Sequence, residues 1–202
     1  MRIGIFGGSF DPVHYGHLLL AELCRESYEL DEVRLVPAAI PPHKQDQGRA
    51  ADEHRLHMLH LAIGGHPKIS AWDVELQRGG VSYTVETLQA LRAEQPTDEL
   101  FFLMGADSLF DLPNWRSPEE ICELATLAVV DRPGNRDVNF EVLSDIVSPE
   151  RIEHFRKHVV RMPQLEISSS EIRRRVAGKK SIRFQTPRAV EQYIAEESLY
   201  VS

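Results

Sequence analysis

Apolar-rich runs of strand length alternate with helical patterns along most of the chain. Four such runs occupy residues 3–6, 33–36, 100–104 and 127–130. Short apolar runs of this kind are typical of buried strands in a parallel sheet. Two further extended segments are predicted at residues 69–76 and 159–160. Apolar residues recurring at helical spacing predict helices at residues 17–29, 52–63, 85–91, 140–147 and after Thr186-Pro187.

Two further helix starts are marked by capping patterns. Ser117 is followed by Pro118 and, three residues after the serine, by Glu120, while Ser168 is followed by Glu171. A serine whose hydroxyl accepts from the third helical amide, with an acidic residue there reaching back, is a capping box. Proline is also favoured at the first helical position. The pattern therefore predicts helices that begin at residues 117–118 and at residue 168.

Strands separated by helices predict a doubly wound, Rossmann-like α/β fold, a parallel sheet with helices on both faces. We expect one domain over residues 1–202, with a small C-terminal helical part from about residue 168. Ligands of such sheets bind beyond the carboxyl ends of the strands. The chemically distinctive segments of this chain all follow predicted strands, so we expect them to form one site.

Charge and cysteine content narrow the classes of partner. The formal net charge is −8, which argues against a protein that tracks nucleic acid. No apolar stretch reaches the roughly 18 to 20 residues that span a bilayer, and the first apolar run is too short for a signal peptide. The only cysteines, Cys24 and Cys122, form no paired motif, so we expect a cytoplasmic protein. The sequence leaves the oligomeric state open.

A glycine-rich segment with two histidines follows the first predicted strand. Residues 7–17 read GGSFDPVHYGH. Gly7 and Gly8 are expected to let the backbone turn tightly, and amides at the next helix start favour an anion. His14 and His17, three residues apart, share one helical face and can point at one phosphate group. Zinc is an alternative ligand, but it needs three or four ligands and no further Cys or His motif supplies them.

A second phosphate-binding segment is predicted near residue 170. Residues 167–173 read ISSSEIR at a capped helix start, where hydroxyls and amides suit phosphate oxygens. Arg173 lies on the first turn and can form a forked contact with a phosphate. We expect phosphate contacts from Ser169, Ser170 and Arg173. The remaining basic residues are expected to form a solvated face: Arg174, Arg175, Lys179 and Lys180.

These two segments resemble the HxGH and ISSSxIR signatures of the nucleotidylyltransferase superfamily. The chain most resembles bacterial nicotinate-nucleotide adenylyltransferases, from Arg2 to Tyr200. The resemblance implies transfer of AMP from ATP to nicotinate mononucleotide, giving nicotinate adenine dinucleotide and pyrophosphate in NAD biosynthesis. It implies catalytic roles for His14, His17 and Arg173, and Mg²⁺ carried by the ATP phosphates. It implies ATP contacts from Gly7, Gly8, Ser9, Phe10, Gly105, Asp107, Arg132, Ile167, Ser169 and Ser170.

The same resemblance assigns residues to the acceptor nucleotide. Residues 78–84, RGGVSYT, resemble a family segment in which a main-chain N–H, here of Thr84, binds the nicotinate carboxylate, with Ser82 and Tyr83 beside it. Trp115 resembles the tryptophan that stacks on the pyridine ring, and the Arg116 amide is assigned to the carboxylate. His43 and Lys44 match a basic pair near phosphates. Asp107, after a strand, is assigned to ribose between the nucleotides.

Two other readings remain open at this point. Phosphopantetheine adenylyltransferase shares the glycine segment, but it typically has threonine where this chain has His14, and it lacks the SYT and tryptophan segments. A nucleotide-binding sensor on the same fold would lack chemistry, although the intact His14, His17 and Arg173 argue against it. Three further histidines, His54, His57 and His60, recur every three residues on one helix. Because a helical turn takes about 3.6 residues, they point in successively different directions and spread over a face. We expect that face to be partly solvated.

Overall fold

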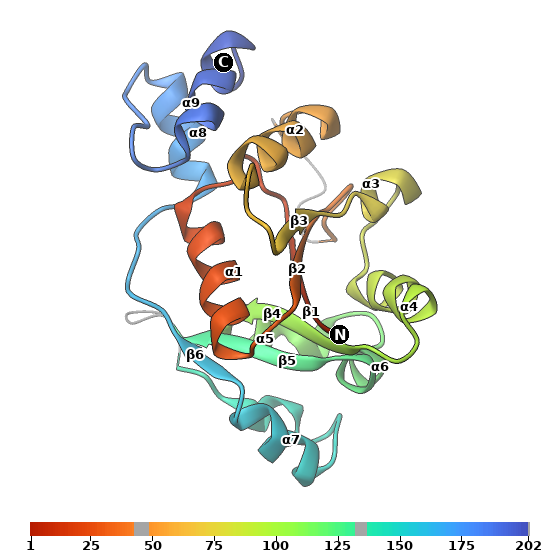
Figure 1. Cartoon of the computed structure of the whole chain (residues 1–202). Coiled ribbons are helices and arrows are strands. Elements are labelled where there is room, and N and C mark those ends of the chain that lie inside the picture. Colours follow the sequence, from red (N-terminus) through yellow and green to blue (C-terminus); the bar gives the residue numbers. More distant parts are fainter. Residues whose placement is uncertain (43–48, 132–136, 202) are drawn as a thin grey trace. The chain divides into compact units, whose positions relative to one another are not determined.

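Six strands form one sheet in the order β3-β2-β1-β4-β5-β6 (Figure 1). The computed structural model describes residues 1–42, 49–131 and 137–201. The pairs β1–β4, β4–β5 and β5–β6 are parallel, with Ile5 opposite Phe102 and Met104 opposite Val129. The strands are β1 (Arg2–Gly8), β2 (Glu32–Pro37), β3 (Ile69–Ala71), β4 (Glu99–Gly105), β5 (Thr126–Asp131) and β6 (Val159–Arg161). The predicted Rossmann-like α/β fold is confirmed.

Helices separate most of these strands. They are α1 (Tyr15–Ser27), α2 (Asp52–Ile63), α3 (Val74–Arg78), α4 (Thr84–Glu94), α5 (Ala106–Asp111), α6 (Pro118–Leu124), α7 (Pro149–Arg156), α8 (Ser169–Ala177) and α9 (Arg188–Glu196). Two 3-10 turns, Leu112–Asn114 and Phe140–Leu143, complete the regular structure. Helix α2 has the predicted bounds, and α8 begins one residue after its predicted cap.

Several local predictions were wrong. The expected extended segment at residues 69–76 is extended only in β3, and α3 follows it. The expected helix at residues 140–147 is a 3-10 turn, while α5 and α7 were not predicted. Ser117 precedes α6, but within the described chain its side chain makes no capping hydrogen bond. Its φ of 51° is left-handed, whereas a capping residue needs an extended backbone.

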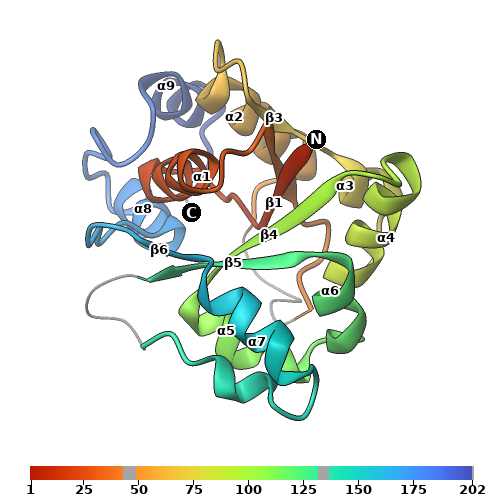
Figure 2. The ribbon, with the colours of Figure 1, turned by 60° about the horizontal axis from the view of Figure 1, so that its bottom comes forward.

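The chain forms two compact units, and β1, β2 and α1 each contribute residues to both. The first unit comprises residues 1–6, 20–34 and 83–164, and the second comprises residues 7–19, 35–82 and 165–202. In the first unit, α1 and α4 lie on opposite sides of β1 in both views, and α5, α6 and α7 pack along β5 (Figure 2). The buried apolar strands β4 and β5 form the core of this unit.

The second unit holds α2, α3, α8, α9 and the segment that follows β1. Helices α2 and α9 pack against each other, and the Tyr193 hydroxyl lies 2.7 Å from Nδ1 of His54. The three histidines of α2 are partly solvated as predicted, because His57 and His60 are exposed. Among the residues described, no helix is both long and apolar enough to cross a membrane.

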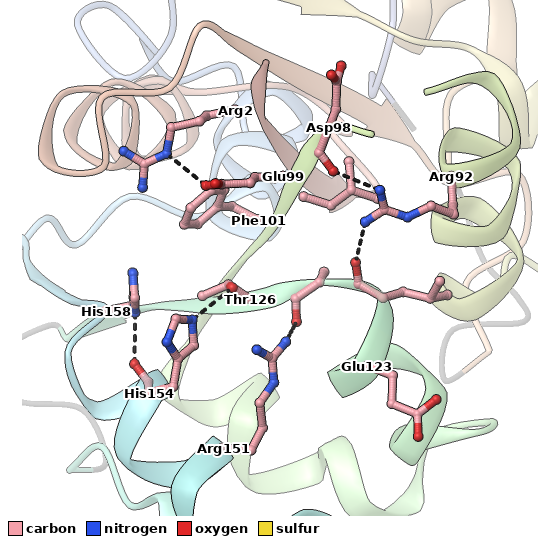
Figure 3. Close-up of a pocket in the computed structure, with 13 residues that line it drawn as sticks. Arg2, Arg92, Asp98, Glu99, Phe101, Glu123, Thr126, Arg151, His154 and His158 are labelled. Carbon is pink, nitrogen blue, oxygen red and sulfur yellow. Dashed lines mark hydrogen bonds and ion pairs between the residues drawn. The ribbon is translucent and has the colours of Figure 1, made fainter. Parts of the chain in front are cut away.

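A cavity of about 320 Å³ lies in the first unit at the amino ends of β4 and β5 (Figure 3). Two of its acidic groups are neutralised locally, because Asp98 pairs with the Met1 amino group and Glu99 with Arg2. Burial, and then the neighbouring His158 and Arg151, lower the pKa of His154. The charges of this cavity therefore balance one another, and we assign it no substrate.

Arginines of this cavity hold the carboxyl end of α6. The Arg151 guanidinium donates to the Cys122 carbonyl from Nε at 3.0 Å and from Nη2 at 2.7 Å, and to the Ala125 carbonyl at 3.0 Å. Arg92 donates to the Leu124 carbonyl at 3.2 Å and to the Asp98 carbonyl at 2.7 Å. The last carbonyls of a helix lack partners within it, so these cations stabilise the end of α6.

We predict that Arg151→Ala lowers the free energy of unfolding by about 2–3 kcal/mol, since it removes charged donors from part-buried carbonyls. Arg156→Ala on the same helix is the matched control. Arg156 pairs only with exposed Glu141 and Glu153 in the described chain, and such pairs contribute less than about 1 kcal/mol. Urea unfolding of the three proteins checks this. Equal losses of unfolding free energy in both variants would show that the carbonyl contacts of Arg151 stabilise the protein no more than the exposed ion pairs of Arg156.

Candidate active site

The turn after β1 is set by Phe10 rather than by the glycines. Gly7 and Gly8 are the last residues of β1, and neither has a positive φ, so the predicted tight turn at these glycines is wrong. The left-handed residue is Phe10, with φ 45°. A Cβ on Gly8 would lie 3.1 Å from the Phe10 ring, whereas a Cβ on Gly7 would meet nothing within 4 Å. Gly8 therefore makes room for Phe10, and Gly7 leaves the strand end open.

The two histidines of the glycine segment lie together. The His14 and His17 rings stack with centroids 3.7 Å apart and planes 25° from parallel. The His14 amide donates to Nδ1 of His17 at 3.3 Å. A ring nitrogen that accepts a hydrogen bond carries no proton, so in neutral His17 the proton is on Nε2. Nδ1 of His17 therefore accepts from the main chain, and Nε2 is the donor of the neutral ring.

Neighbouring residues fix the positions of both rings. His14 is buried, and a Cβ on Gly16 would lie 3.0 Å from its ring, so Gly16 is needed for that packing. The Phe10 ring is also buried and contacts His17 edge-on with centroids 5.0 Å apart. The Phe10 side chain therefore supports His17 from the interior.

The start of α8 contacts the same segment. The Ser168 hydroxyl accepts from the Glu171 amide at 3.2 Å, which confirms the predicted cap. The Ser169 hydroxyl donates to the Pro12 carbonyl at 2.8 Å, so its proton is already engaged. Ser170 is exposed, 3.2 Å from the Ser168 hydroxyl. Ile167 directly precedes the capping serine.

Arg173 differs from the other basic residues of α8. Its Nη1 donates to the Asp11 carbonyl at 2.6 Å and lies 3.5 Å from Oδ2 of Asp11. Arg174 instead pairs with Glu171 one turn back, with Nε 2.8 Å from Oε2, and its side chain is 77% exposed. The Arg175 Nε donates to the Ser181 carbonyl at 2.8 Å. Within α8, Arg173 is therefore the arginine attached to the histidine-bearing segment.

Sequence reasoning missed Arg55, a fully buried residue of α2. Its Nη1 donates to the Ser9 carbonyl at 2.7 Å, and its Nη2 to the Ala38 carbonyl at 2.6 Å and to Asp52 at 2.5 Å. Arg55 joins the segment after β1 to the segment after β2. A lone arginine among histidines on a helical pattern gave no signal for this role.

In the first unit, the side chain of Arg116 meets the start of α4. The Arg116 guanidinium pairs with Glu86 at 2.8 Å and lies over the Tyr83 ring at 4.7 Å. In the described chain the amides of Thr84 and Arg116 have no hydrogen-bond partner. Trp115 is half-buried, with its ring 6.0 Å from that of Phe102 in a T-shaped contact. The Arg116 side chain thus reaches the start of α4, while the Trp115 ring packs toward β4.

The remaining predicted site residues lie in different parts of the chain, and some fall outside the described residues. Ser82 belongs to the second unit, where its buried hydroxyl accepts from the Ala39 amide at 2.9 Å. Gly105 ends β4, and Asp107 lies exposed in the first turn of α5. His43, Lys44 and Arg132 fall outside the described residues. In the described part of the chain, no group of three Cys, His, Asp or Glu residues is placed to hold a metal ion.

Comparisons with known proteins show the family to which the chain belongs. The family model described as cytidylyltransferase-like matches residues 5–175. A probable nicotinate-nucleotide adenylyltransferase of Thermomicrobium roseum is 46% identical over 98% of this chain and 91% of its own length. Its counterpart in Citrifermentans bemidjiense is 43% identical over 100% of this chain and 99% of its own length.

A solved structure shares the fold at lower sequence identity. The nicotinic acid mononucleotide adenylyltransferase of Plasmodium falciparum, complexed with NaAD, superimposes with a TM-score of 0.78 at 22% identity, covering 99% of this chain and 97% of that one. Because the two curated relatives are similar over almost their full lengths, the protein belongs to the nicotinate-nucleotide adenylyltransferases of the cytidylyltransferase-like family.

Proposed function

We propose that this protein transfers the AMP part of ATP to nicotinate mononucleotide, forming nicotinate adenine dinucleotide and pyrophosphate in NAD biosynthesis. The observation that carries the proposal is the stacked pair His14 and His17 on a segment to which Arg173 is hydrogen bonded. Two imidazoles on one segment and a guanidinium hydrogen bonded to that segment suit an anionic, phosphate-rich ligand. Curated relatives with the same printed activity support the choice of substrates.

The reaction is a substitution at phosphorus. A 5′-phosphate oxygen of the acceptor attacks the α-phosphorus of ATP, a new P–O bond forms, and the bond to the β-phosphate oxygen breaks to release pyrophosphate. The attacking phosphate is already anionic near neutral pH, so the protein needs no general base. Its contribution is positioning and stabilisation of developing charge. We assign that charge stabilisation to His14, His17 and Arg173, with Gly8, Ser9 and Ser170 as further donors.

We propose that Mg²⁺ enters as the ATP complex. Magnesium keeps several waters and is commonly held by substrate phosphates with few protein ligands. The His14 and His17 imidazoles and the Arg173 guanidinium are hydrogen-bond donors, which suit the phosphates rather than the ion itself. We also place the enzyme in the cytoplasm. Cys24 and Cys122 are buried free thiols, and burial raises the pKa of each to about 12, as suits unreactive core residues.

The direct test incubates the protein with ATP, Mg²⁺ and single acceptors, and separates the products by chromatography with a pyrophosphate assay. Nicotinate mononucleotide should give the dinucleotide and pyrophosphate in equal amounts. Phosphopantetheine is the matched acceptor for the sister enzyme. The proposal would be contradicted if phosphopantetheine were the only acceptor that gave pyrophosphate. It would also be contradicted if none of the acceptors gave pyrophosphate.

We predict that His17→Ala folds normally and loses about 10²- to 10³-fold in kcat, because one preorganised donor to the developing charge is removed. His57→Ala is the control. His57 is an exposed histidine of the same unit whose ring contacts Tyr193 rather than the glycine segment. Steady-state kinetics on both variants checks this, and near wild-type turnover in His17→Ala would remove His17 from the mechanism.

We predict that Arg173→Lys raises the KM for ATP and lowers kcat, together by about tenfold or more, since lysine loses the planar fork of donors. Arg174→Lys should leave both constants within about twofold of the wild type, because exposed pairs contribute little. The same kinetic assay compares the two. If Arg174→Lys proved equally harmful, the assignment of the phosphate-facing arginine to position 173 would be wrong.

We predict at least a tenfold preference in kcat/KM for nicotinate over nicotinamide mononucleotide. The unpaired amides of Thr84 and Arg116 suit two carboxylate oxygens, whereas a carboxamide presents its own N–H₂ to one of them. A buried donor left unpaired costs about 1–3 kcal/mol, and about 1.4 kcal/mol is a factor of ten. Trp115→Ala should weaken both acceptors, because stacking depends on the ring and not on its substituent.

Measuring kcat/KM for both acceptors in wild type and Trp115→Ala separates the two roles. Equal efficiencies in the wild type would rule out the carboxylate site. Loss of the preference alone in Trp115→Ala would rule out stacking.

A further inference from the structure

Asp11 is a buried carboxylate to which the proposed chemistry gives no role. Its side chain is 1% exposed. Oδ1 accepts from the Tyr200 hydroxyl at 2.6 Å and from the Ala50 amide at 3.1 Å. An ionised carboxylate is retained in an interior only when hydrogen bonds and an opposite charge compensate for its lost hydration. The opposite charge here is Arg173, whose Nη1 lies 3.5 Å from Oδ2.

Asp11 holds Arg173 by one edge of the guanidinium. Nη1 of Arg173 donates to the Asp11 carbonyl at 2.6 Å and faces the Asp11 carboxylate as well. Over the residues that the structure describes, Nε and Nη2 of Arg173 have no partner, and the side chain is 32% exposed. A guanidinium carries five N–H donors in a fixed plane. Fixing one edge therefore sets the direction in which the remaining donors point.

Tyr200 in turn holds the carboxylate of Asp11. Burial, and then the charge of Asp11, raise the pKa of Tyr200, so its hydroxyl stays protonated and donates at every physiological pH. The residue has a left-handed backbone, with φ 61°, which few non-glycine residues adopt without a specific reason. The chain after α9 thus returns to the segment after β1, and its contact there is a hydrogen bond to Asp11.

We infer that Asp11 and Tyr200 are positioning residues that orient Arg173 toward the phosphates of ATP. The inference rests on the proposed function. Tyr200 fixes Oδ1 of Asp11, so Oδ2 and the main-chain carbonyl of Asp11 hold the near edge of Arg173. Loss of the hydroxyl lets the carboxylate rotate, and the donors of Arg173 no longer point in one direction.

The test is a double-mutant cycle between Tyr200→Phe and Arg173→Lys, read as kcat and as the KM for each substrate. We expect Tyr200→Phe to lower kcat and raise the KM for ATP, by about tenfold together, with the KM for the acceptor unchanged. In the Arg173→Lys background the same substitution should change these constants by less than about twofold, since no planar fork remains to be oriented. A role in folding alone predicts equal effects in both backgrounds.

Tyr193→Phe is the matched control, because it also removes a tyrosine hydroxyl from a 2.7 Å hydrogen bond in the same unit, here to His54. It should leave kcat and both KM values unchanged. Asp11→Asn provides a second arm, since the asparagine carbonyl can still accept from Tyr200 while its N–H₂ faces Arg173. We expect a larger loss than in Tyr200→Phe, with circular dichroism confirming that the variant is folded.

Wild-type kinetics in folded Tyr200→Phe or Asp11→Asn would overturn the inference, as would equal losses in both backgrounds. The dissociation constant of an ATP analogue with Mg²⁺, measured by calorimetry, separates this failure from failure of the proposed function. If the wild type formed no dinucleotide, the same double-mutant cycle could be measured through the dissociation constant of the ATP analogue. It would still report whether Tyr200 acts through Arg173.

Discussion

Three consecutive main-chain carbonyls after β1 receive hydrogen bonds from side chains of the C-terminal part of the chain. Arg173 donates to Asp11, Ser169 to Pro12, and Thr186 to Val13. In each pair the donor and the acceptor are 157 to 173 positions apart in the sequence. The segment has no regular structure there, so its carbonyls lack strand or helix partners and need others when shielded from water. The position of the segment that bears His14 and His17 depends on these three donors.

The same contacts indicate how the proposed phosphate site could form in a chain of net charge −8. Arg173 and Ser169 sit at the start of α8, where the helix dipole and unpaired amides favour an anion. Their contacts to Asp11 and Pro12 place that helix start at the histidine-bearing segment. Arg55 is fully buried and paired with Asp52, and its contribution is to hold the Ser9 carbonyl. Hydrogen bonds to the main chain thus bring the Arg173 side chain to the histidine-bearing segment.

The sequence was informative where the physical cause is local. Apolar runs marked β1, β4 and β5, the Ser168 cap predicted α8, and the spacing of three predicted that His14 and His17 share a face. It was misleading where backbone geometry decides, as at Gly7 and Gly8, which lie in β1. The pairing of Asp11 with Tyr200 could not be predicted, because it joins positions 189 residues apart. The Arg55 contacts depend on tertiary packing for the same reason.

We propose that the segment after β1 and the start of α8 act as one phosphate site. Hydrogen–deuterium exchange of the wild-type protein, with and without ATP and Mg²⁺, tests it at the level of single peptides. We expect ATP to slow exchange in peptides covering residues 7–19 and 165–177 together, with no change in α7 (Pro149–Arg156). Protection of only one of the two segments, or of neither, would contradict it.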